Sequence, residues 1–391
     1  MIAAKRYHPS KRFAKRFENI TDPPMVVKKS AGSRARIVLM SDMRPPTMAQ
    51  IAERAGVALS TVSYVLSGKR AVSPEIRERV LAAIEELDYR PHGPARALAS
   101  GNSHTIALFL PSPRWQLIPV QQTFVAGATQ ETSASDYALL LSTSPADPET
   151  IARVVELGRA DGVILMETLA HDRRIERLRA GGHPFTLIGR TADTNGISFV
   201  DVDTGAAVEK GLAYLAELGH RCVALFNFPQ DQLDAGYNAA LIARDVFEEA
   251  TGALDIRGIH LPCSHPAGEA LAVATELLRT EPDCTAAITT GWQFTGLLGA
   301  LRAADLHVPD DFSIVSVIEA QFAEMLTPAL TGIEWPAFEA GRLAAEMLIE
   351  QLRGRAPGER QLLIGGELVV RESTGPVRRM ISPRPRSEAT A

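Results

Sequence analysis

From residue 105 onward, short apolar runs of strand length alternate with amphipathic stretches of helix length. The expected strands are 105–110, 138–142, 162–166, 185–188, 223–228, 286–289 and 312–317. The expected helices are 123–135, 151–158, 204–218, 237–251, 268–280 and 294–304. Strands separated by helices predict parallel sheets flanked by helices, with ligand sites at the carboxyl ends of the strands. The pattern therefore favours an α/β core of two lobes, with a pocket in the cleft between them.

The segment 47–89 has a different pattern, that of three short helices. Thr47 and Gln50 fit a capping box, and Gly56 suits the end of the first helix because glycine adopts the left-handed conformation without a Cβ penalty. A second helix is expected over 59–66, and a third begins at Ser73 and Pro74, a capping hydroxyl followed by a proline at the first helical position. The residues expected to form the small core are Met48, Ile51, Ala52, Ala55, Val62, Val65, Leu66, Ile76, Val80, Leu81, Ile84 and Leu87. Two short helices joined by a tight turn form a helix-turn-helix, whose second helix enters the major groove of DNA.

The second of these helices has one face suited to reading bases. Leu59 and Ser63 are four residues apart, as are Ser60 and Tyr64, so these side chains lie on one side of the helix. Hydroxyls can bond either base type, and an aliphatic group suits a thymine methyl. The alternative is a solvated helix face with no partner.

A short stretch after the third helix favours the DNA interpretation. Pro94 suits the start of a helix of two turns at most, which is marginal in water and folds only against a partner chain or DNA. Leu98 on that helix is a candidate wedge between base steps in the minor groove. Its alternative role is that of a core leucine in a linker.

The phrases IAERAGV, STVSYVL, VSPEIRERV, AAIEELDYRP and ARALA resemble the DNA-binding headpiece and hinge helix of the LacI/GalR family of bacterial repressors. The resemblance implies that Leu59, Ser60, Ser63 and Tyr64 read bases and that Leu98 opens the centre of the operator. Three positions depart from the family pattern, namely Ala58, Tyr64 and His92. Tyr64 stands where the lactose repressor has an arginine, which puts a guanine contact at that position in doubt.

Further phrases extend the resemblance to about residue 376, among them FVDVDTGAAVEKGLAYLAELGHR and LTPALTGIEWPAFEAGRLAAEMLIEQLRG. They imply a core similar to periplasmic sugar-binding proteins, in which the chain crosses between lobes three times. The expected organisation is a basic arm at 1–44, a headpiece at 45–92, a hinge at 93–103, a core at 104–376 and a disordered tail at 377–391. Within the core we expect lobe one to hold 104–218 and 331–360, and lobe two to hold 219–330 and 361–376.

The cleft lacks three polar anchors that sugar-sensing family members use. Leu233, the pair Thr290 and Gly291, and the pair Ile318 and Glu319 stand at those positions. Unpaired hydroxyls in such a cleft would cost on the order of 1–3 kcal/mol each, so we expect a low affinity for a simple free sugar. The remaining candidate effector contacts are Trp115, Arg190, Asp203, Trp292, Gln293 and Glu319. We therefore expect an atypical effector or none; Arg190 and Asp203 have the alternative of pairing or helix capping, and Trp292 that of lobe packing.

The formal net charge of −5 hides an uneven distribution. Lysines and arginines number 11 against 3 acidic residues in 1–44, 7 against 6 in 45–100, and 23 against 37 in the rest. An acidic body thus follows a basic arm and a nearly neutral headpiece. The candidates for DNA backbone contacts are Thr47, Arg54, Thr61, Lys69, Arg70, Arg77 and Arg96.

Other classes of protein are weakly supported. The cysteines Cys222, Cys263 and Cys284 lack CxxC spacing, so we expect reduced thiols and no metal site. No apolar run reaches the roughly 18 residues that span a bilayer, and residues 1–44 lack the apolar core of an export signal, although Met40, Met43 or Met48 is an alternative start. The GxxxxGK[ST], HExxH and GxSxG motifs of common enzyme classes are absent.

The predicted function is that of a sequence-specific regulator of transcription, a repressor. We expect it to bind a pseudo-palindromic operator as a homodimer, to be modulated by a small-molecule effector, to need no cofactor and to reside in the cytoplasm. Two alternatives remain open. One is a small-molecule-binding protein without a DNA role, and the other is a DNA-binding regulator that has no effector.

Overall fold

The computed structural model of the protein describes residues 46–67, 70–89, 102–110, 119–143, 147–264, 267–355 and 358–377. It divides into a small helical headpiece and a large α/β core, each described by itself. The expected basic arm, most of the hinge and almost all of the C-terminal tail lie outside the described residues. None of the described helices is long and apolar enough to cross a membrane.

The headpiece consists of α2 (Met48–Ala55), α3 (Leu59–Ser67) and α4 (Pro74–Glu86). The predicted capping box is present: the Thr47 hydroxyl accepts from the Gln50 amide, and the Gln50 side-chain oxygen accepts from the Thr47 amide at 2.8 Å. Gly56 ends α2 with a φ of 63°, and the Ser73 hydroxyl caps α4. These caps confirm the boundaries that the sequence predicted.

The core of the headpiece is formed by Ile51, Val62 and Val80, which are fully buried. Leu81 does not join it: its side chain is 47% exposed because it lies about 100° around α4 from Val80. Arg79, which the sequence did not single out, donates to the carbonyl oxygens of Ala55 and Gly56. These hydrogen bonds give partners to carbonyl oxygens that the end of α2 leaves unpaired, and they link that helix to α4.

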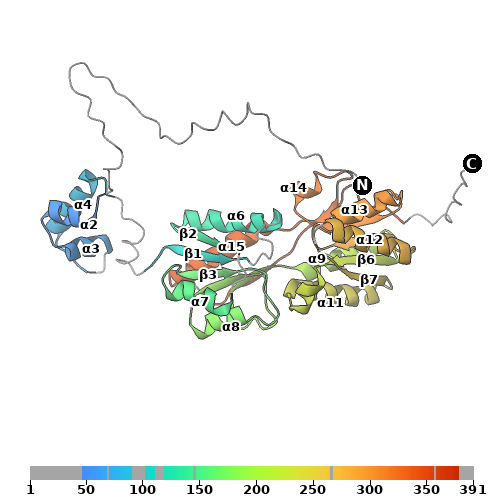
Figure 1. The fold of residues 1–391 in the computed structure, drawn as a ribbon, viewed down its shortest axis with the longest axis horizontal. Coiled ribbons are helices and arrows are strands. Elements are labelled where there is room, and N and C mark those ends of the chain that lie inside the picture. Colours follow the sequence, from blue (N-terminus) through green and yellow to red (C-terminus); the bar gives the residue numbers. More distant parts are fainter. Residues whose placement is uncertain are drawn as a thin grey trace, which may run out of the picture. The chain divides into compact units, whose positions relative to one another are not determined.

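The large α/β core contains two six-stranded sheets, several strands of which are labelled in Figure 1. Sheet one has the order β11-β5-β4-β3-β1-β2 and is parallel throughout. Its strands are β1 (Thr105–Phe109), β2 (Ala138–Ser142), β3 (Gly162–Leu165), β4 (Phe185–Ile188), β5 (Phe199–Val202) and β11 (Gln361–Ile364). Sheet two has the order β12-β10-β9-β8-β6-β7, and only the pairing of β12 with β10 is antiparallel. Its strands are β6 (Cys222–Asn227), β7 (Arg257–Pro262), β8 (Ala286–Thr289), β9 (Ser313–Val317), β10 (Thr331–Ile333) and β12 (Leu368–Val369).

Helices cover both faces of each sheet, which is why the central strands are buried along nearly their whole length and consist mostly of apolar residues. In lobe one, α6 (Pro119–Ala134) and α15 (Ala337–Leu352) cover one face, and α7 (Pro148–Glu156) and α8 (Arg173–Ala180) cover the other. In lobe two, α9 (Thr204–Glu217) and α11 (Asn238–Ala253) lie opposite α12 (Ala267–Thr280) and α13 (Phe294–Ala303). Two short helices, α10 (Gln230–Asp234) and α14 (Ala320–Ala323), complete lobe two.

The predicted division of the core into lobes, 104–218 with 331–360 and 219–330 with 361–376, is wrong at each of its three crossings. The chain leaves lobe one after β5, because α9 buries Val208, Leu212 and Leu215 against sheet two. It returns after β10, which pairs with β9 and so belongs to lobe two. It crosses a third time after β11, which pairs with β5 in lobe one. The two crossings near the C-terminus therefore lie in the segments 334–336 and 365–367.

Candidate functional site

The exposed face of α3 carries the residues predicted to read bases. Leu59 is 52% exposed and Ser60 is also exposed, while Ser63 and Tyr64 are half-buried. Val62 and Val65, on the opposite side of the helix, are buried in the headpiece. We call Leu59, Ser60, Ser63 and Tyr64 the reading face. An exposed aliphatic side chain at the start of such a helix is suited to a contact with a thymine methyl.

The cations of the headpiece differ in what they contact. Arg54 forms an exposed ion pair with Glu86 at 2.6 Å, and this hydrogen bond raises the pKa of the guanidinium. The Thr47 hydroxyl is occupied by the capping box, and Thr61 is half-buried on α3. Arg70 and Arg77 are exposed. Of the remaining predicted contacts with DNA, Lys69, Arg96 and Leu98 lie outside the described residues.

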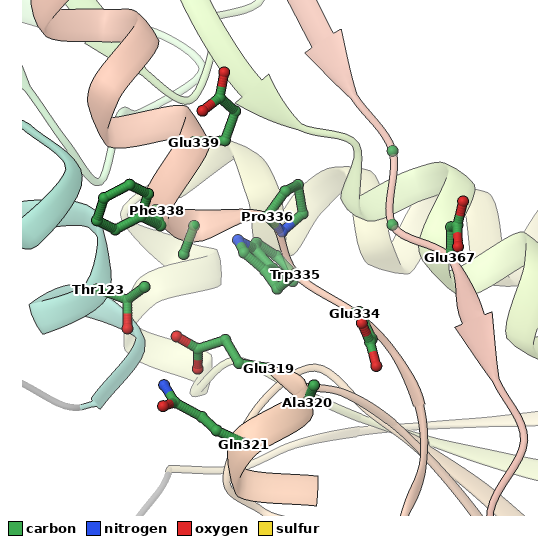
Figure 2. Close-up of a pocket in the computed structure, with 13 residues that line it drawn as sticks. Thr123, Glu319, Ala320, Gln321, Glu334, Trp335, Pro336, Phe338, Glu339 and Glu367 are labelled. Atoms are coloured by element: carbon green, nitrogen blue, oxygen red, sulfur yellow. The ribbon is translucent and has the colours of Figure 1, made fainter.

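A pocket of about 540 Å³ lies in the core where two of the crossings between lobes meet. Its walls come from α6, from the turn that follows β9, from the segments 334–337 and 365–367, and from the start of α15. It is lined by Thr123, Glu319, Ala320, Gln321, Glu334, Trp335, Pro336, Ala337, Phe338, Glu339, Gly365, Gly366 and Glu367. Figure 2 shows the side chains of Glu319 and Thr123 facing one space, with Trp335 and Phe338 along its other side.

Glu319 is the predicted effector contact that this pocket contains. Its side chain is 7% exposed, and its Oε1 atom has no hydrogen-bond partner among the described residues. Burial raises the pKa of this carboxyl, and a hydrogen bond with the Thr123 side chain opposes the shift. The Nε1 atom of Trp335 is likewise buried without a partner in the described part of the chain. The residues that line the pocket thus include an acceptor and a donor that no described residue satisfies.

None of the other predicted effector residues that the structure describes lines this pocket. Arg190 pairs with Asp201 at 3.3 Å, and Asp203 accepts from the Ala206 amide at 3.1 Å as the N-cap of α9. Asp203 therefore has the alternative role that the sequence left open, that of a helix cap. Trp292 packs against Phe294 and Phe322. Gln293 is fully buried and donates to the Asn227 carbonyl at 3.2 Å, and Trp115 lies outside the described residues.

A second contact between the lobes was not expected from the sequence. Leu169 of lobe one and Tyr237 of lobe two form an isolated antiparallel bridge. Beside it, the Ala170 amide donates to the Gly236 carbonyl at 2.8 Å, and the Asn238 side chain donates to the Arg190 carbonyl at 2.8 Å. We call this set of contacts the inter-lobe latch. No pattern in the sequence indicated these contacts.

The latch covers two carboxyls of lobe one. Burial raises the pKa of Glu167 to about 7, opposed by a hydrogen bond from Gln121 at 2.5 Å. Burial also raises the pKa of Asp201 to about 6, against the positive charge of Arg190. Burial raises the pKa of the Tyr237 phenol, and the negative charges of Glu167 and Asp201 raise it further. Burial thus raises the pKa of both carboxyls toward neutral pH, while the ion pair with Arg190 favours the charged form of Asp201.

Two family models match the chain. The model of bacterial regulatory proteins of the lacI family matches residues 47–92, and that of a periplasmic binding protein-like domain matches residues 212–374. Among curated proteins, the HTH-type transcriptional regulator CelR of Thermobifida fusca is 30% identical over 347 residues, which cover 85% of this chain and 100% of the relative. The ribose operon repressor of Escherichia coli (strain K12) is 29% identical and covers 78% of this chain and 93% of its own length.

Solved structures are similar in fold. A complex of the transcriptional regulator CelR with cellobiose has a TM-score of 0.63 at 27% identity, covering 84% of this chain and 99% of that one. The lac repressor dimer bound to operator and the anti-inducer ONPF has a TM-score of 0.72 at 23% identity, covering 85% of this chain and 100% of that one. The latter likeness concerns the arrangement of the helices and sheets.

Proposed function

The chain belongs to the LacI family of bacterial transcriptional regulators, and from this premise we propose that it is a repressor that binds a pseudo-palindromic operator as a homodimer. The reading face of α3 carries the proposal, since it places the exposed side chains of Leu59 and Ser60 at the start of the second helix of a helix-turn-helix. Two copies related by a two-fold axis would read two half-sites. We further propose that it acts by binding alone, without catalysis, in the cytoplasm beside the chromosome.

We propose the pocket at the crossings as the place of the effector. The crossing segments must change conformation when the lobes move, so a ligand that contacts them is coupled to lobe closure. The cellobiose complex of CelR supports the presence of a small-molecule effector in this family branch. Of the contacts predicted from the sequence, Glu319 is the one that we retain for direct binding, because it lines the pocket.

The test of DNA binding uses the full-length protein and genomic fragments selected by footprinting and sequencing. We expect protection of two half-sites related by a two-fold axis, and an affinity that falls with salt. Leu59→Ala should weaken operator binding by about 1–3 kcal/mol, roughly five- to 150-fold, while leaving binding to random DNA nearly unchanged. Leu157→Ala is the matched control. Leu157 is similarly exposed, at 57%, but it lies on the surface of the large α/β unit and not in the headpiece. Equal affinity of the wild-type protein for operator and random DNA would refute the proposal.

A further inference from the structure

Within the residues that the structure describes, the pocket at the crossings is lined by four glutamates and by no lysine or arginine. Glu334 pairs with Arg371 at 2.8 Å and Glu339 with Arg342 at 2.7 Å. Among the described residues, neither Glu319 nor Glu367 has an ion-pair partner. The lining is therefore negative even after the two ion pairs are counted, and an anionic ligand such as a sugar phosphate would meet repulsion without a compensating cation.

One further cation lies at the edge of the pocket. The Lys210 ammonium donates to the Gly366 carbonyl at 2.6 Å, and Lys210 is exposed on α9. It does not contribute to the lining. A charge that is solvated on the outside offsets little of the field at a buried carboxylate.

Glu319 is the group in the pocket that most requires a ligand. A carboxylate this deeply buried is ordinarily paired or hydrogen-bonded at both oxygens, yet Oε1 has no partner in the described part of the chain. A protonated amine would supply both the opposite charge and a donor. The neighbouring aromatic rings of Trp335 and Phe338 add faces that attract a cation.

We propose that this pocket selects a small organic cation, a protonated amine that also carries hydroxyl groups. In this arrangement the ammonium lies against the Glu319 carboxylate and a ligand oxygen accepts from the Trp335 indole. The proposal rests on the assignment of the pocket as the effector site and specifies the chemical class of the effector.

The test compares ligands of one shape and different charge on the full-length protein, by titration calorimetry and thermal shift. Glucosamine carries an ammonium, N-acetylglucosamine and glucose are neutral, and glucose 6-phosphate is an anion. We expect glucosamine to bind about tenfold or more tightly than the neutral sugars, since a hydrogen bond between charged groups is about twice as strong as one between neutral groups. Equal or tighter binding of a neutral sugar or of the phosphate overturns the proposal, as does the absence of glucosamine binding at millimolar concentration.

Two variants separate the charge from the shape of the pocket. Glu319→Gln keeps the size and hydrogen-bonding capacity of the side chain and should remove the preference for glucosamine over N-acetylglucosamine. Glu249→Gln makes the same change of charge on the exposed surface of α11 and should leave the preference intact. A preference that survives in Glu319→Gln overturns the proposal. Operator binding without any ligand is measured on the same samples: if it persists while the charge preference is absent, the ligand class is wrong and the regulator function stands.

Discussion

Helices α6 and α15 approach so closely that two glycines leave no room for a side chain. A Cβ built on Gly127 would lie 1.9 Å from the Phe338 carbonyl oxygen, and one on Gly341 would lie 2.0 Å from the Phe124 carbonyl oxygen. Ordinary contacts begin at 3.4 Å, so Gly127→Ala leaves a shortfall of about 1.5 Å. The neighbouring atom belongs to a helix backbone and cannot rotate away. The helices must therefore separate.

The size of the effect follows from two opposing contributions. Overpacking of a well-packed interior costs about 1–3 kcal/mol, and a clash with backbone lies at the upper end of that range. Alanine in place of glycine inside a helix contributes about 1 kcal/mol in the opposite direction. The net destabilisation is about 2 kcal/mol, which corresponds to a decrease in Tm of roughly 4–8 °C for a domain of this size. Thr123 and Phe338 lie on these helices and line the pocket, so ligand affinity should fall as well.

The assay is thermal unfolding of the full-length protein followed by circular dichroism. Gly252→Ala in α11 is the matched control, since nothing lies within 4 Å of a Cβ at that position. That variant should gain stability, by about 0.5–1 kcal/mol, from the loss of glycine alone. If Gly127→Ala proves as stable as the wild type, or shifts Tm in the same direction as Gly252→Ala, the reasoning on close helix packing is refuted.

Three other changes have defined outcomes. Asp203→Ala removes the N-cap of α9 and should lower the free energy of unfolding by about 1 kcal/mol in urea titrations, whereas Asp203→Asn should retain most of it. Glu167 has a folded-state pKa of about 7, above its unfolded value, so the folded core keeps a proton that the unfolded chain releases. The free energy of unfolding should therefore fall by up to about 3 kcal/mol as the pH rises from about 4.5 to about 7. Glu167→Gln should flatten that fall, and an unchanged pH profile would contradict the assignment. Arg77→Ala should reduce the slope of log affinity against log salt by about one without altering base preference, which anisotropy titrations at several salt concentrations can measure.

The headpiece was predictable because its signals are local. A capping threonine, a glycine at the end of α2 and a serine followed by proline act within a few residues, and each lies where the sequence placed it. Most inner strands of both sheets were predictable as well, because strands buried on both faces are apolar runs. The exceptions are β5, a buried inner strand that was not among the expected ones because Asp201 interrupts its apolar run, and the three-residue β10. Arg79 escaped notice because a charged residue on an exposed helix carries no local sign that it binds the end of another helix.

The errors concern pairings between segments distant in sequence. β10 has three residues and β12 has two, too few to give a periodic pattern, and β11 alternates between exposed and half-buried residues at the edge of its sheet. Their lobes are set by hydrogen bonds to β9, β10 and β5, which composition does not reveal. The same holds for the site: Asp203 and Gln293 are polar residues near strand ends, yet one caps a helix and the other is fully buried.

The interleaved crossings also determine the order in which the molecule can be completed during synthesis. A ribosome delivers the chain from the amino end, and domains usually begin to fold as they emerge. Lobe one, however, lacks α15, one of the two helices that cover one face of its sheet, until residue 352 has left the exit tunnel, and its edge strand follows only at 361–364. A nascent chain that stops before residue 337 therefore leaves the part of sheet one under α15 uncovered. We expect a premature stop codon there to prevent stable folding of the first lobe, although most of its residues have already been translated.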